Sequence, residues 1–484
     1  MPQTSTKQRR RKACVIGSGP NGLAAAIVLA QAGLEVQVFE AEPEIGGGVR
    51  TLDLTLPGFH HDFGSAVHPL AAGSPFFSSL PLADYGLEWV HSPETLAHPF
   101  DDGTAITLNR NINEAAAALQ ADGSAWRSLM QPLATHWADL VPELLRPILA
   151  VPKHPFLLAS FGLKAILPAT TVARRFRTER ARALFGGLAA HSFLRLNQPL
   201  SGSFGIVLGA AAHAAGWPIP RGGAQSLANA LAAHLAHLGG SITTSTRIQS
   251  LADLPACDLT LCDVTPRQLL ALAGQAAPGK LSSSYRRRLD TYKYGPAAFK
   301  VDFALSRPIP WNAPACLRAA TVHLGGTFDE LATSEDAMAS GSPAAKPFVL
   351  LAQPTLFDFT RAPAGKHIAW AYCHVPNGST EDMLERLESQ IERFATGFRS
   401  TILARHVFSP AALEERDANL IGGDIVGGAS NLRQLLFRPT RRQYRTSAPD
   451  IYLCSSSTPP GGGVHGMCGA NAARMALRDH KWSG

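Results

Sequence analysis

The pattern of apolar and polar positions near the start of the chain predicts a strand, a tight turn, a helix and a second strand. Residues 13–16 form a short apolar run, residues 23–32 are rich in alanine and leucine, and a second apolar run at 36–39 ends on Glu40. Short apolar runs are typical of buried strands, and a longer alanine-rich segment is typical of a helix. This order predicts the first half of a dinucleotide-binding βαβ unit.

The turn of this unit has a glycine for each mechanical requirement. Gly17 allows the sharp turn, Gly19 lets the backbone approach a pyrophosphate, and Gly22 lets the helix pack close to the strand. The helix N-terminus then offers free N–H groups and a positive dipole end to phosphates. Glu40 is placed to accept hydrogen bonds from a ribose diol. The residues predicted to bind the cofactor here are Gly17, Gly19, Pro20, Asn21, Gly22 and Glu40.

A second glycine cluster follows the ribose acid. Gly47 and Gly48 would again let the backbone approach a phosphate, and Arg50 is the charged partner expected for the pyrophosphate. No second GxGxxG pattern follows a strand elsewhere, which argues against a separate NAD-binding domain.

The rest of the chain alternates between helical and strand patterns. Helical patterns dominate from 69 to 216, an amphipathic helix is expected at 224–238, and alternation at 299–305 indicates a strand. Further strands at 348–354 and 367–374 predict an antiparallel sheet in a second domain. The remaining predicted elements are helices at 112–119, 126–140, 179–190 and 384–398, strands at 241–248, 256–263 and 450–455, and a glycine turn with a helix at 461–477.

Composition describes an ordinary folded protein of 484 residues, with 45% apolar and 17% charged residues. The net charge of +7 is mostly local, because Lys7, Arg9, Arg10, Arg11 and Lys12 leave 39 basic against 37 acidic residues elsewhere. Because the rest of the chain is close to neutral, we do not expect a nucleic-acid partner. The basic leader 1–12 is interpreted as a solvated segment, with a mitochondrial-type presequence or a membrane-surface contact left open. The odd number of cysteines favours a reducing compartment, by default the cytoplasm, or mitochondria in a eukaryotic source.

Residues 140–177 combine Leu, Ile, Phe and Pro with basic residues, and no acid follows Glu143. Three interpretations stay open for this apolar and basic helical region. It is typical of a peripheral membrane contact, of a lid over an apolar pocket, and of core helices with solvated lysines.

Several blocks of the sequence resemble one family. They are 17–22, 46–51, 57–62, 216–223, 299–305, 421–424, 452–454 and 461–467. The chain resembles FAD-dependent oxidoreductases of the phytoene desaturase-like group, and within it the pyridine nucleotide-disulphide oxidoreductase domain-containing proteins allied to carotenoid desaturases and retinol saturases. The resemblance covers nearly the whole chain, and its two terminal blocks are specific.

The resemblance implies an α/β fold with an α+β second domain. A Rossmann-type FAD-binding domain would be assembled from residues 13–70, 217–275 and 420–484, and a substrate domain with an antiparallel sheet and helices from residues 71–216 and 276–419. The last glycine turn and helix would adjoin the flavin ring and stabilise negative charge there. Further cofactor contacts are expected from Ile248, Gly462, Gly463, Val464 and His465.

Catalytic candidates are few. His465 is either a proton donor or hydrogen-bond partner at the flavin, or a structural contact to its turn. Lys300 either faces the flavin, as a lysine does in some amine oxidases, or forms a surface salt bridge with Asp302. His68 and His191 are candidates for the substrate pocket, although each is more often a core or surface histidine.

Other chemistries lack support in the sequence. Cys257 and Cys262 have the C-x4-C spacing of disulphide reductases, but a separation of five puts their side chains on opposite faces of a strand. No ligand spacing predicts a metal, and no GxSxG turn predicts a serine nucleophile.

The leading hypothesis is hydride exchange at flavin N5 with an apolar small molecule, by desaturation, saturation or isomerisation of an isoprenoid, polyene or acyl chain. The alternatives are an FAD-dependent amine oxidase and a non-catalytic flavoprotein that binds a partner or a membrane. The sequence leaves open the electron acceptor, the direction of the reaction and the oligomeric state.

Overall fold

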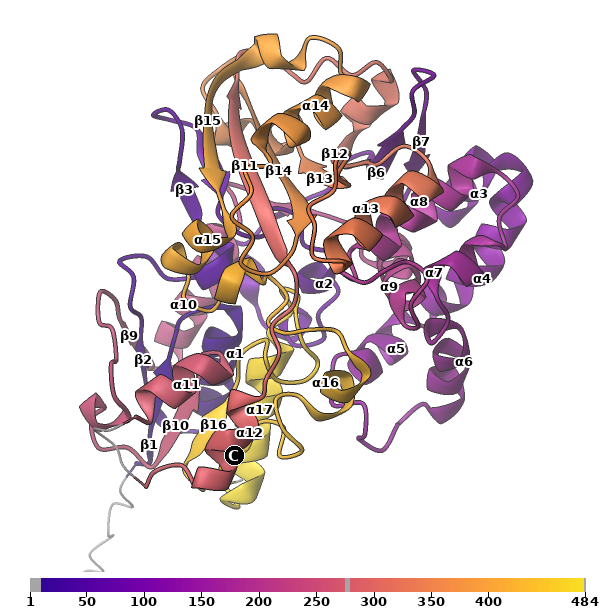
Figure 1. Ribbon diagram of the computed structural model, residues 1–484. Coiled ribbons are helices and arrows are strands. Elements are labelled where there is room, and N and C mark those ends of the chain that lie inside the picture. Colours follow the sequence, from indigo (N-terminus) through magenta and orange to yellow (C-terminus); the bar gives the residue numbers. More distant parts are fainter. Residues whose placement is uncertain (1–9, 275–278, 483–484) are drawn as a thin grey trace, which may run out of the picture.

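The computed structural model describes residues 10–274 and 279–482, so most of the predicted leader lies outside the described residues. Within them the chain builds a five-stranded parallel sheet and a seven-stranded, mainly antiparallel sheet, joined by two short two-stranded ribbons. Figure 1 shows the parallel sheet at the lower left, the larger sheet at the top and a helical region at the right. This arrangement is the predicted α/β class with a mixed second domain.

The parallel sheet has the strand order β16-β10-β1-β2-β9. The central strand pairs with a neighbour on each side, and Val15 lies between Leu261 and Val38 in register. The strands are β1 (Lys12–Ile16), β2 (Glu35–Phe39), β9 (Ser241–Thr243), β10 (Leu259–Cys262) and β16 (Ile451–Leu453).

Helices cover both faces of this sheet, as a parallel sheet requires. One face packs with Val15 and Val38 against α1 (Pro20–Gln31), α10 (Gln225–His237) and α17 (Met467–Asp479). The other face packs against α11 (Pro266–Leu272) and α12 (Ser283–Asp290). All strands of this sheet fall in the three segments predicted for the FAD-binding domain. Helix α12 corrects that division, because it was assigned to the substrate domain and instead packs on α11.

The second sheet has the order β15-β11-β14-β13-β12-β6-β7, and strand β11, which pairs with the edge strand β15 and with β14, is buried along its whole length. Phe299, Val301 and Phe303 point into a core under α14, whereas Ala298, Lys300 and Asp302 point to the opposite face. The two-residue period of a strand therefore sends the polar residues toward the nucleotide-binding sheet. The strands are β6 (Glu94–Pro99), β7 (Ala105–Leu108), β11 (Ala297–Leu305), β12 (Ala319–Leu324), β13 (Val349–Ala352), β14 (His367–Val375) and β15 (Ile402–Phe408).

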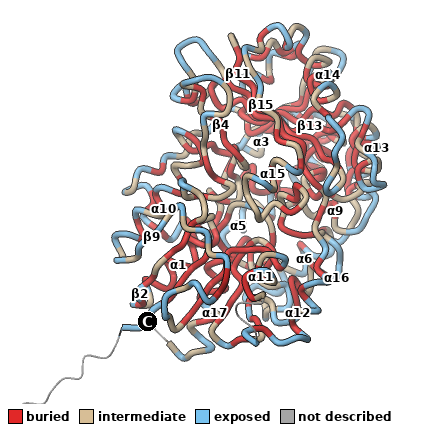
Figure 2. Tube along the Cα trace, turned by 60° about the vertical axis from the view of Figure 1, so that its left-hand side comes forward, coloured by how far each residue is buried: buried red, intermediate tan, exposed pale blue. Residues whose placement is uncertain are grey.

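The helical region packs beside this sheet, and the predicted helix at 126–140 is divided at His136 into α4 and α5. Figure 2 shows that α1 and strands such as β11 and β13 are buried, whereas the outer turns are exposed. The region consists of α3 (Ile112–Ala118), α4 (Gly123–Thr135), α5 (Trp137–Leu144), α6 (Pro155–Ala165), α7 (Ala169–Ala173), α8 (Glu179–Ala190) and α9 (Ser201–Ala214). The remaining elements include α2 (Pro69–Ala72), α13 (Phe328–Ala339), α14 (Leu384–Phe394), α15 (Pro410–Arg416), α16 (Leu432–Phe437) and the ribbons β3 (Thr51–Asp53) with β4 (His60–Asp62) and β5 (Trp89–Val90) with β8 (Ile219–Pro220).

In the described part of the chain, every helix falls short of the length and apolar content needed to cross a bilayer.

Candidate functional site

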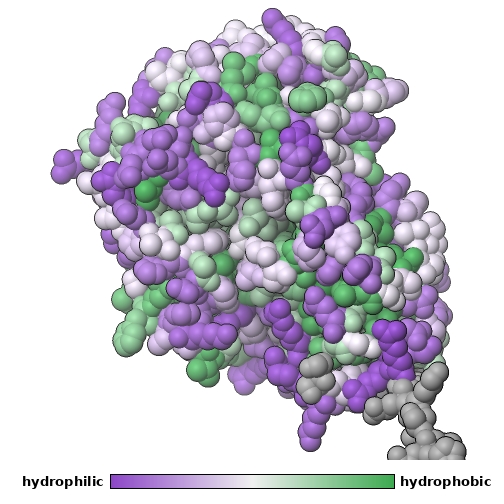
Figure 3. Space-filling view, turned by 180° about the vertical axis from the view of Figure 1, so that it is seen from behind, coloured by the Kyte–Doolittle hydropathy of each residue, from purple (hydrophilic) through white to green (hydrophobic). Residues whose placement is uncertain are grey.

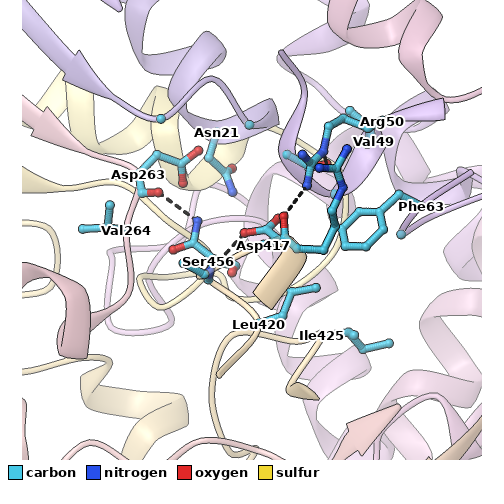
Figure 4. Close-up of a pocket in the computed structure, with 18 of the residues that line it drawn as sticks. Asn21, Val49, Arg50, Phe63, Asp263, Val264, Asp417, Leu420, Ile425 and Ser456 are labelled. Atoms are coloured by element: carbon cyan, nitrogen blue, oxygen red, sulfur yellow. Dashed lines mark hydrogen bonds between the residues drawn. The ribbon is translucent and has the colours of Figure 1, made fainter. Parts of the chain in front are cut away.

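A cavity of about 680 Å³ lies where the carboxyl ends of the parallel strands meet the second sheet. Ile16 and Phe39 end β1 and β2 at its wall, and Asp263 follows β10 there. From the other side, Lys300 of β11 and Tyr372 of β14 reach it. The carboxyl edge of a parallel sheet is where such folds bind ligands. Figure 4 shows the polar side chains of Asn21, Asp263 and Arg50 in the upper part of the site and the apolar side chains of Leu420 and Ile425 below them.

The glycine turn after β1 needs its glycines for steric reasons. Gly17 has a positive φ of 97°, and a Cβ on Gly22 would overlap the carbonyl oxygen of Gly17. Gly19 is the N-cap of α1, so the backbone of the turn faces the cavity at the positive end of the helix. Of the predicted residues here, Gly17, Gly19, Pro20 and Asn21 line the cavity, whereas Gly22 lies behind them.

Asp263 is a site residue that the sequence analysis missed. Its Oδ2 accepts a hydrogen bond from the Gly22 N–H at 2.8 Å. Burial, with the carboxylates of Asp417 and Glu40 nearby, raises the pKa of Asp263 to about 7, although the Gly22 N–H opposes this rise. Asp263 is the last residue of the strand predicted at 256–263, and this position at the carboxyl edge was the signal available in the sequence.

Glu40 is fixed by the turn that it faces. Its Oε2 accepts hydrogen bonds from the Ser18 N–H at 2.8 Å and the Ser18 hydroxyl at 2.6 Å, and its Oε1 accepts one from the Glu42 N–H at 3.0 Å. A carboxylate has about four acceptor positions, so one stays available for a hydroxyl donor. The side chain lines the cavity, as its predicted role requires.

Arg50 is only 1% exposed, yet it lines the cavity. Its Nε donates to the Gly47 carbonyl at 2.9 Å, its Nη2 donates to the Arg416 carbonyl at 2.9 Å, and the guanidinium lies 4.9 Å from the centre of the Phe63 ring. Within the described residues, Nη1 makes no hydrogen bond and lies 3.6 Å from the Glu42 carboxylate. A rigidly held guanidinium with an unused N–H suits a diphosphate.

The second glycine cluster packs on the first. Gly46 and Gly47 both have positive φ, and a Cβ on Gly47 would come within 3.3 Å of the Gly19 Cα. Gly46 also donates its N–H to the Ser18 carbonyl at 3.1 Å. The two predicted phosphate-binding segments are therefore adjacent, with Gly47 and Gly48 in the cavity wall.

Ile248 also lines the cavity, but not from a strand. The predicted strand at 241–248 ends at Thr243, because Ser245 has a positive φ of 52° and the Thr246 N–H bonds to the Glu40 carbonyl at 2.7 Å. The chain bends over the end of β2, which brings residues 246–249 to the same end of the cavity as Glu40.

The C-terminal glycine turn contributes Gly463 and Val464 to the wall, whereas Gly462 and His465 lie outside the lining. His465 is fully buried, and its Nδ1 accepts the Met467 N–H at 3.0 Å at the start of α17. Burial lowers the pKa of His465 to about 4, so the ring is neutral near pH 7. This geometry supports the structural alternative for His465, one layer behind Gly463.

The far end of the cavity combines aromatic walls with one buried ammonium. Trp370 and Tyr372 project from alternate positions of β14, with ring centroids 5.1 Å apart, and Phe193 lines the same end. Lys300 is buried and forms an ion pair with Asp302, so the surface salt bridge considered from the sequence is wrong. The aromatic residues were missed, although the Trp-x-Tyr spacing in a predicted strand put both on one face.

The Lys300–Asp302 pair continues toward His61 on β4. The second carboxylate oxygen of Asp302 lies 3.7 Å from His61 Nδ1, and His61 Nε2 lies 2.8 Å from the Thr55 hydroxyl. Burial lowers the pKa of Lys300, raises that of Asp302 to about 6 and lowers that of His61 to about 2. Each charged partner thus depends on the other to remain ionised.

The two histidines predicted for the substrate pocket are separated by the structure. His191 lines the cavity, and its Nε2 lies 3.1 Å from Nε2 of His323. Burial lowers the pKa of His191 to about 3, so the imidazole is a neutral hydrogen-bonding group. His68 is buried outside the lining, with a pKa lowered by burial to about 4.

Further residues join the wall from α15 and the loop after it. Asn419 donates its Nδ2 to the Asp263 carbonyl at 3.0 Å, and Asp417 lies beside Arg50. No sequence pattern marked these two residues. The seven cysteines all lie within the described residues and are free, with Cys262 buried in β10 and Cys257 in the loop before it.

These residues fit FAD. The glycine turns form a cradle that side chains would fill, Arg50 offers an unpaired N–H, and Glu40 retains acceptor capacity. The cavity continues from these nucleotide contacts to Gly463 and the aromatic end, as a cofactor with a nucleotide and a flat ring requires.

Comparison with known families and proteins agrees with this assignment. The family model described as flavin containing amine oxidoreductase matches residues 21–271. Pyridine nucleotide-disulfide oxidoreductase domain-containing protein 2 of Mus musculus is 28% identical over 97% of this chain and 94% of its own length. A phytoene desaturase (lycopene-forming) of Pseudescherichia vulneris is 26% identical over 63% of this chain and 65% of its own length. The resemblance inferred from the sequence is confirmed.

Solved structures confirm the fold. An oxidoreductase from Methanosarcina mazei superposes with a TM-score of 0.63 at 16% identity, covering 96% of this chain and 100% of that one. Putrescine oxidase with bound putrescine gives a TM-score of 0.58 at 16% identity, covering 98% and 99% of the two chains. The matched relatives include enzymes, which supports an enzyme over the non-catalytic flavoprotein. The chain belongs to the flavin-containing amine oxidoreductase family and is an FAD-dependent oxidoreductase.

Proposed function

We propose that the protein exchanges a hydride with an apolar substrate, an isoprenoid, polyene or acyl chain that is desaturated, saturated or isomerised. The observation that carries this proposal is the chemistry of the far end of the cavity. Phe193, Trp370, Tyr372 and Ala298 line it, and its charged side chain is the ammonium of Lys300. Asp302 compensates the Lys300 charge within their ion pair, so the surface that this end offers a substrate is mainly aromatic and apolar.

FAD supplies hydride acceptance and donation when bound. The protein's own residues hold it through the glycine turns, Glu40 and Arg50, and exclude water at the far end with the aromatic side chains. In a desaturation the substrate would lose a hydride and a proton from adjacent carbons, with oxygen, a quinone or a nicotinamide nucleotide as the final oxidant. Lys300 lines the cavity and would accept the proton in its neutral form, which burial favours by lowering the pKa of Lys300.

Oxidation of an amine is the second candidate. Trp370 and Tyr372 form two aromatic surfaces at 75° in the cavity wall, and aromatic faces attract ammonium groups. The family description and the putrescine-bound structural relative point the same way. Among the described residues that line the far end there is no carboxylate to pair with a substrate ammonium, and this opposes it.

An anaerobic substrate screen on the FAD-loaded protein separates the two candidates. We expect the visible flavin absorbance to bleach with polyene or isoprenoid substrates presented in detergent micelles, and to persist with putrescine and cyclohexylamine. Bleaching by amines alone would overturn the proposal in favour of the second candidate. Lys300→Met/Asp302→Leu, tested together with the native protein, adds a check, because loss of the group proposed to accept the proton should slow the bleaching.

A further inference from the structure

Helix α6 and the loop before it expose a cluster of large apolar side chains. Among the described residues, six of the eleven large hydrophobic side chains that are exposed lie within residues 148–166. Phe156 is 90% exposed and Val151 is 87% exposed. We call this the 148–166 surface, and it consists of Ile148, Leu149, Val151, Phe156, Leu163 and Ile166. A cluster of this kind on a folded protein marks an interaction site.

The helix is apolar on both of its faces. Phe161 and Ala165 are buried on the side that packs against α9, whereas Phe156 and Leu163 face outward. Lys164 is the single charged residue in the sequence of α6. A surface helix of a globular protein normally has a polar outer face, so the outward apolar residues need a second apolar environment.

The loop that carries Ile148, Leu149 and Val151 is held in place. The buried carboxylate of Glu143 accepts the N–H groups of Lys153 at 2.8 Å and His154 at 3.2 Å, and it forms an ion pair with Arg146. The Arg146 guanidinium also donates to the Val151 carbonyl at 2.9 Å. The apolar side chains are therefore presented by an ordered turn.

Basic residues accompany the 148–166 surface. Lys153 is exposed within this surface, the exposed Arg174, Arg175 and Arg177 follow it in the chain, and the sequence from 144 to 178 contains no aspartate or glutamate. A symmetric contact with a second copy would bring these cations face to face, which is unfavourable. Anionic lipid headgroups complement them.

The views of the molecule place this region at one corner. In Figure 1, α6 lies at the right-hand side of the molecule, next to α5. Leu432 of α16, which lies on the other side of α5 in this view, is 64% exposed. Seen from behind in Figure 3, green hydrophobic side chains gather at the lower left edge, on the side where α5 and α6 lie. The apolar region is therefore local and projects from the body of the protein.

We propose that the 148–166 surface docks on an anionic phospholipid bilayer as a peripheral contact. Phe156, Leu163 and the turn at Ile148–Val151 would enter the boundary between headgroups and acyl chains, while the basic residues contact the headgroups. This contact does not depend on the identity of the substrate proposed above.

Flotation of the FAD-loaded protein with vesicles tests the proposal. We expect it to float with vesicles of phosphatidylcholine and phosphatidylglycerol, to float less with phosphatidylcholine alone, and to be released by high salt. The double variant Phe156→Ser/Leu163→Ser should lower partitioning at least about tenfold, since two exposed apolar side chains no longer enter the bilayer.

The matched control is Phe359→Ser/Leu403→Ser, which removes an exposed Phe and an exposed Leu outside this surface. It should float as the native protein does, and both variants should retain bound flavin and their circular dichroism. Equal loss in the two double variants, or no flotation of the native protein, would overturn the proposal. A halving of the native particle mass by the Phe156 and Leu163 changes, measured by light scattering, would instead assign the surface to a contact between copies.

Discussion

The two ends of the cavity are built by different means. At the nucleotide end, backbone atoms of Gly17, Gly19 and Gly47 form the wall, and side chains such as Arg50 are fixed by carbonyl groups. At the far end the wall is made of side chains from the second sheet and from the helical region. Where backbone atoms form the wall, the residue has to be glycine. Where side chains form the wall, the residue types can differ between proteins with different substrates. The nucleotide end is therefore the more readable in the sequence, and the far end carries the specificity.

The largest effect is expected at the far end. Asp302→Ala would leave the Lys300 ammonium buried without its partner, which costs about 3–5 kcal/mol of unfolding free energy. The double variant Lys300→Met/Asp302→Leu should recover most of this loss, because it removes both charges. Urea unfolding of the flavin-loaded protein measures both. A single variant within about 1 kcal/mol of the native protein would contradict the burial of this pair.

A pH-dependent effect is expected at the nucleotide end. The folded protein keeps a proton on Asp263 up to about pH 7, whereas the unfolded chain loses it near pH 4, so this group's contribution to stability falls as the pH rises between these values. The loss reaches at most about 4 kcal/mol. Asp263→Asn should flatten the dependence in the flavin-free protein. Parallel urea titrations from pH 4.5 to 7.5 compare the two, and identical slopes would show that Asp263 ionises normally.

A side chain in the glycine turn should disrupt flavin binding by steric overlap. Gly22→Val would push a side chain into the carbonyl oxygen of Gly17 and weaken flavin binding at least about a hundredfold. Gly33→Ala, at the other end of α1, has open space around its Cβ and should still bind the flavin. Its positive φ should lower the free energy of unfolding by about 1 kcal/mol. Titration of the flavin-free variants with FAD, followed by fluorescence, gives both affinities. Normal binding by Gly22→Val would break the contrast between the two ends.

A smaller effect is expected for the guanidinium. Arg50→Met should weaken FAD binding by about tenfold to a hundredfold, the equivalent of one charge-assisted interaction. Arg247→Met is the matched control, because Arg247 lines the same cavity but is 56% exposed. It should change the affinity less than about threefold. The same FAD titration measures both affinities. Similar losses of affinity in the two variants would contradict a specific role of Arg50 in binding the diphosphate.

The sequence predicted the fold, and most of the residues that it assigned to the nucleotide line the cavity, because both depend on local rules. Glycine at positions 17, 19 and 22 is required by a turn, and the alternation in β11 follows from the pleat of a strand. The burial of Lys300 could not be read in this way, since the residues that cover it come from β4 and β14. The orientation of His465 depends on one N–H at the start of α17. Such contacts between distant segments leave no periodic pattern in the sequence.

The place of β16 and α17 has a consequence for synthesis. Gly469 of α17 packs so closely on α1 that a Cβ there would overlap the Asn21 carbonyl, and β16 completes the edge of the sheet at Ile451–Leu453. The first helix therefore stays without its packing partner, during translation, until residues 451–479 have been synthesised. Non-local pairing of this kind folds slowly and leaves apolar surface open to aggregation in the interval. We expect flavin binding to follow the synthesis of these residues and to stabilise the contact between α1 and α17.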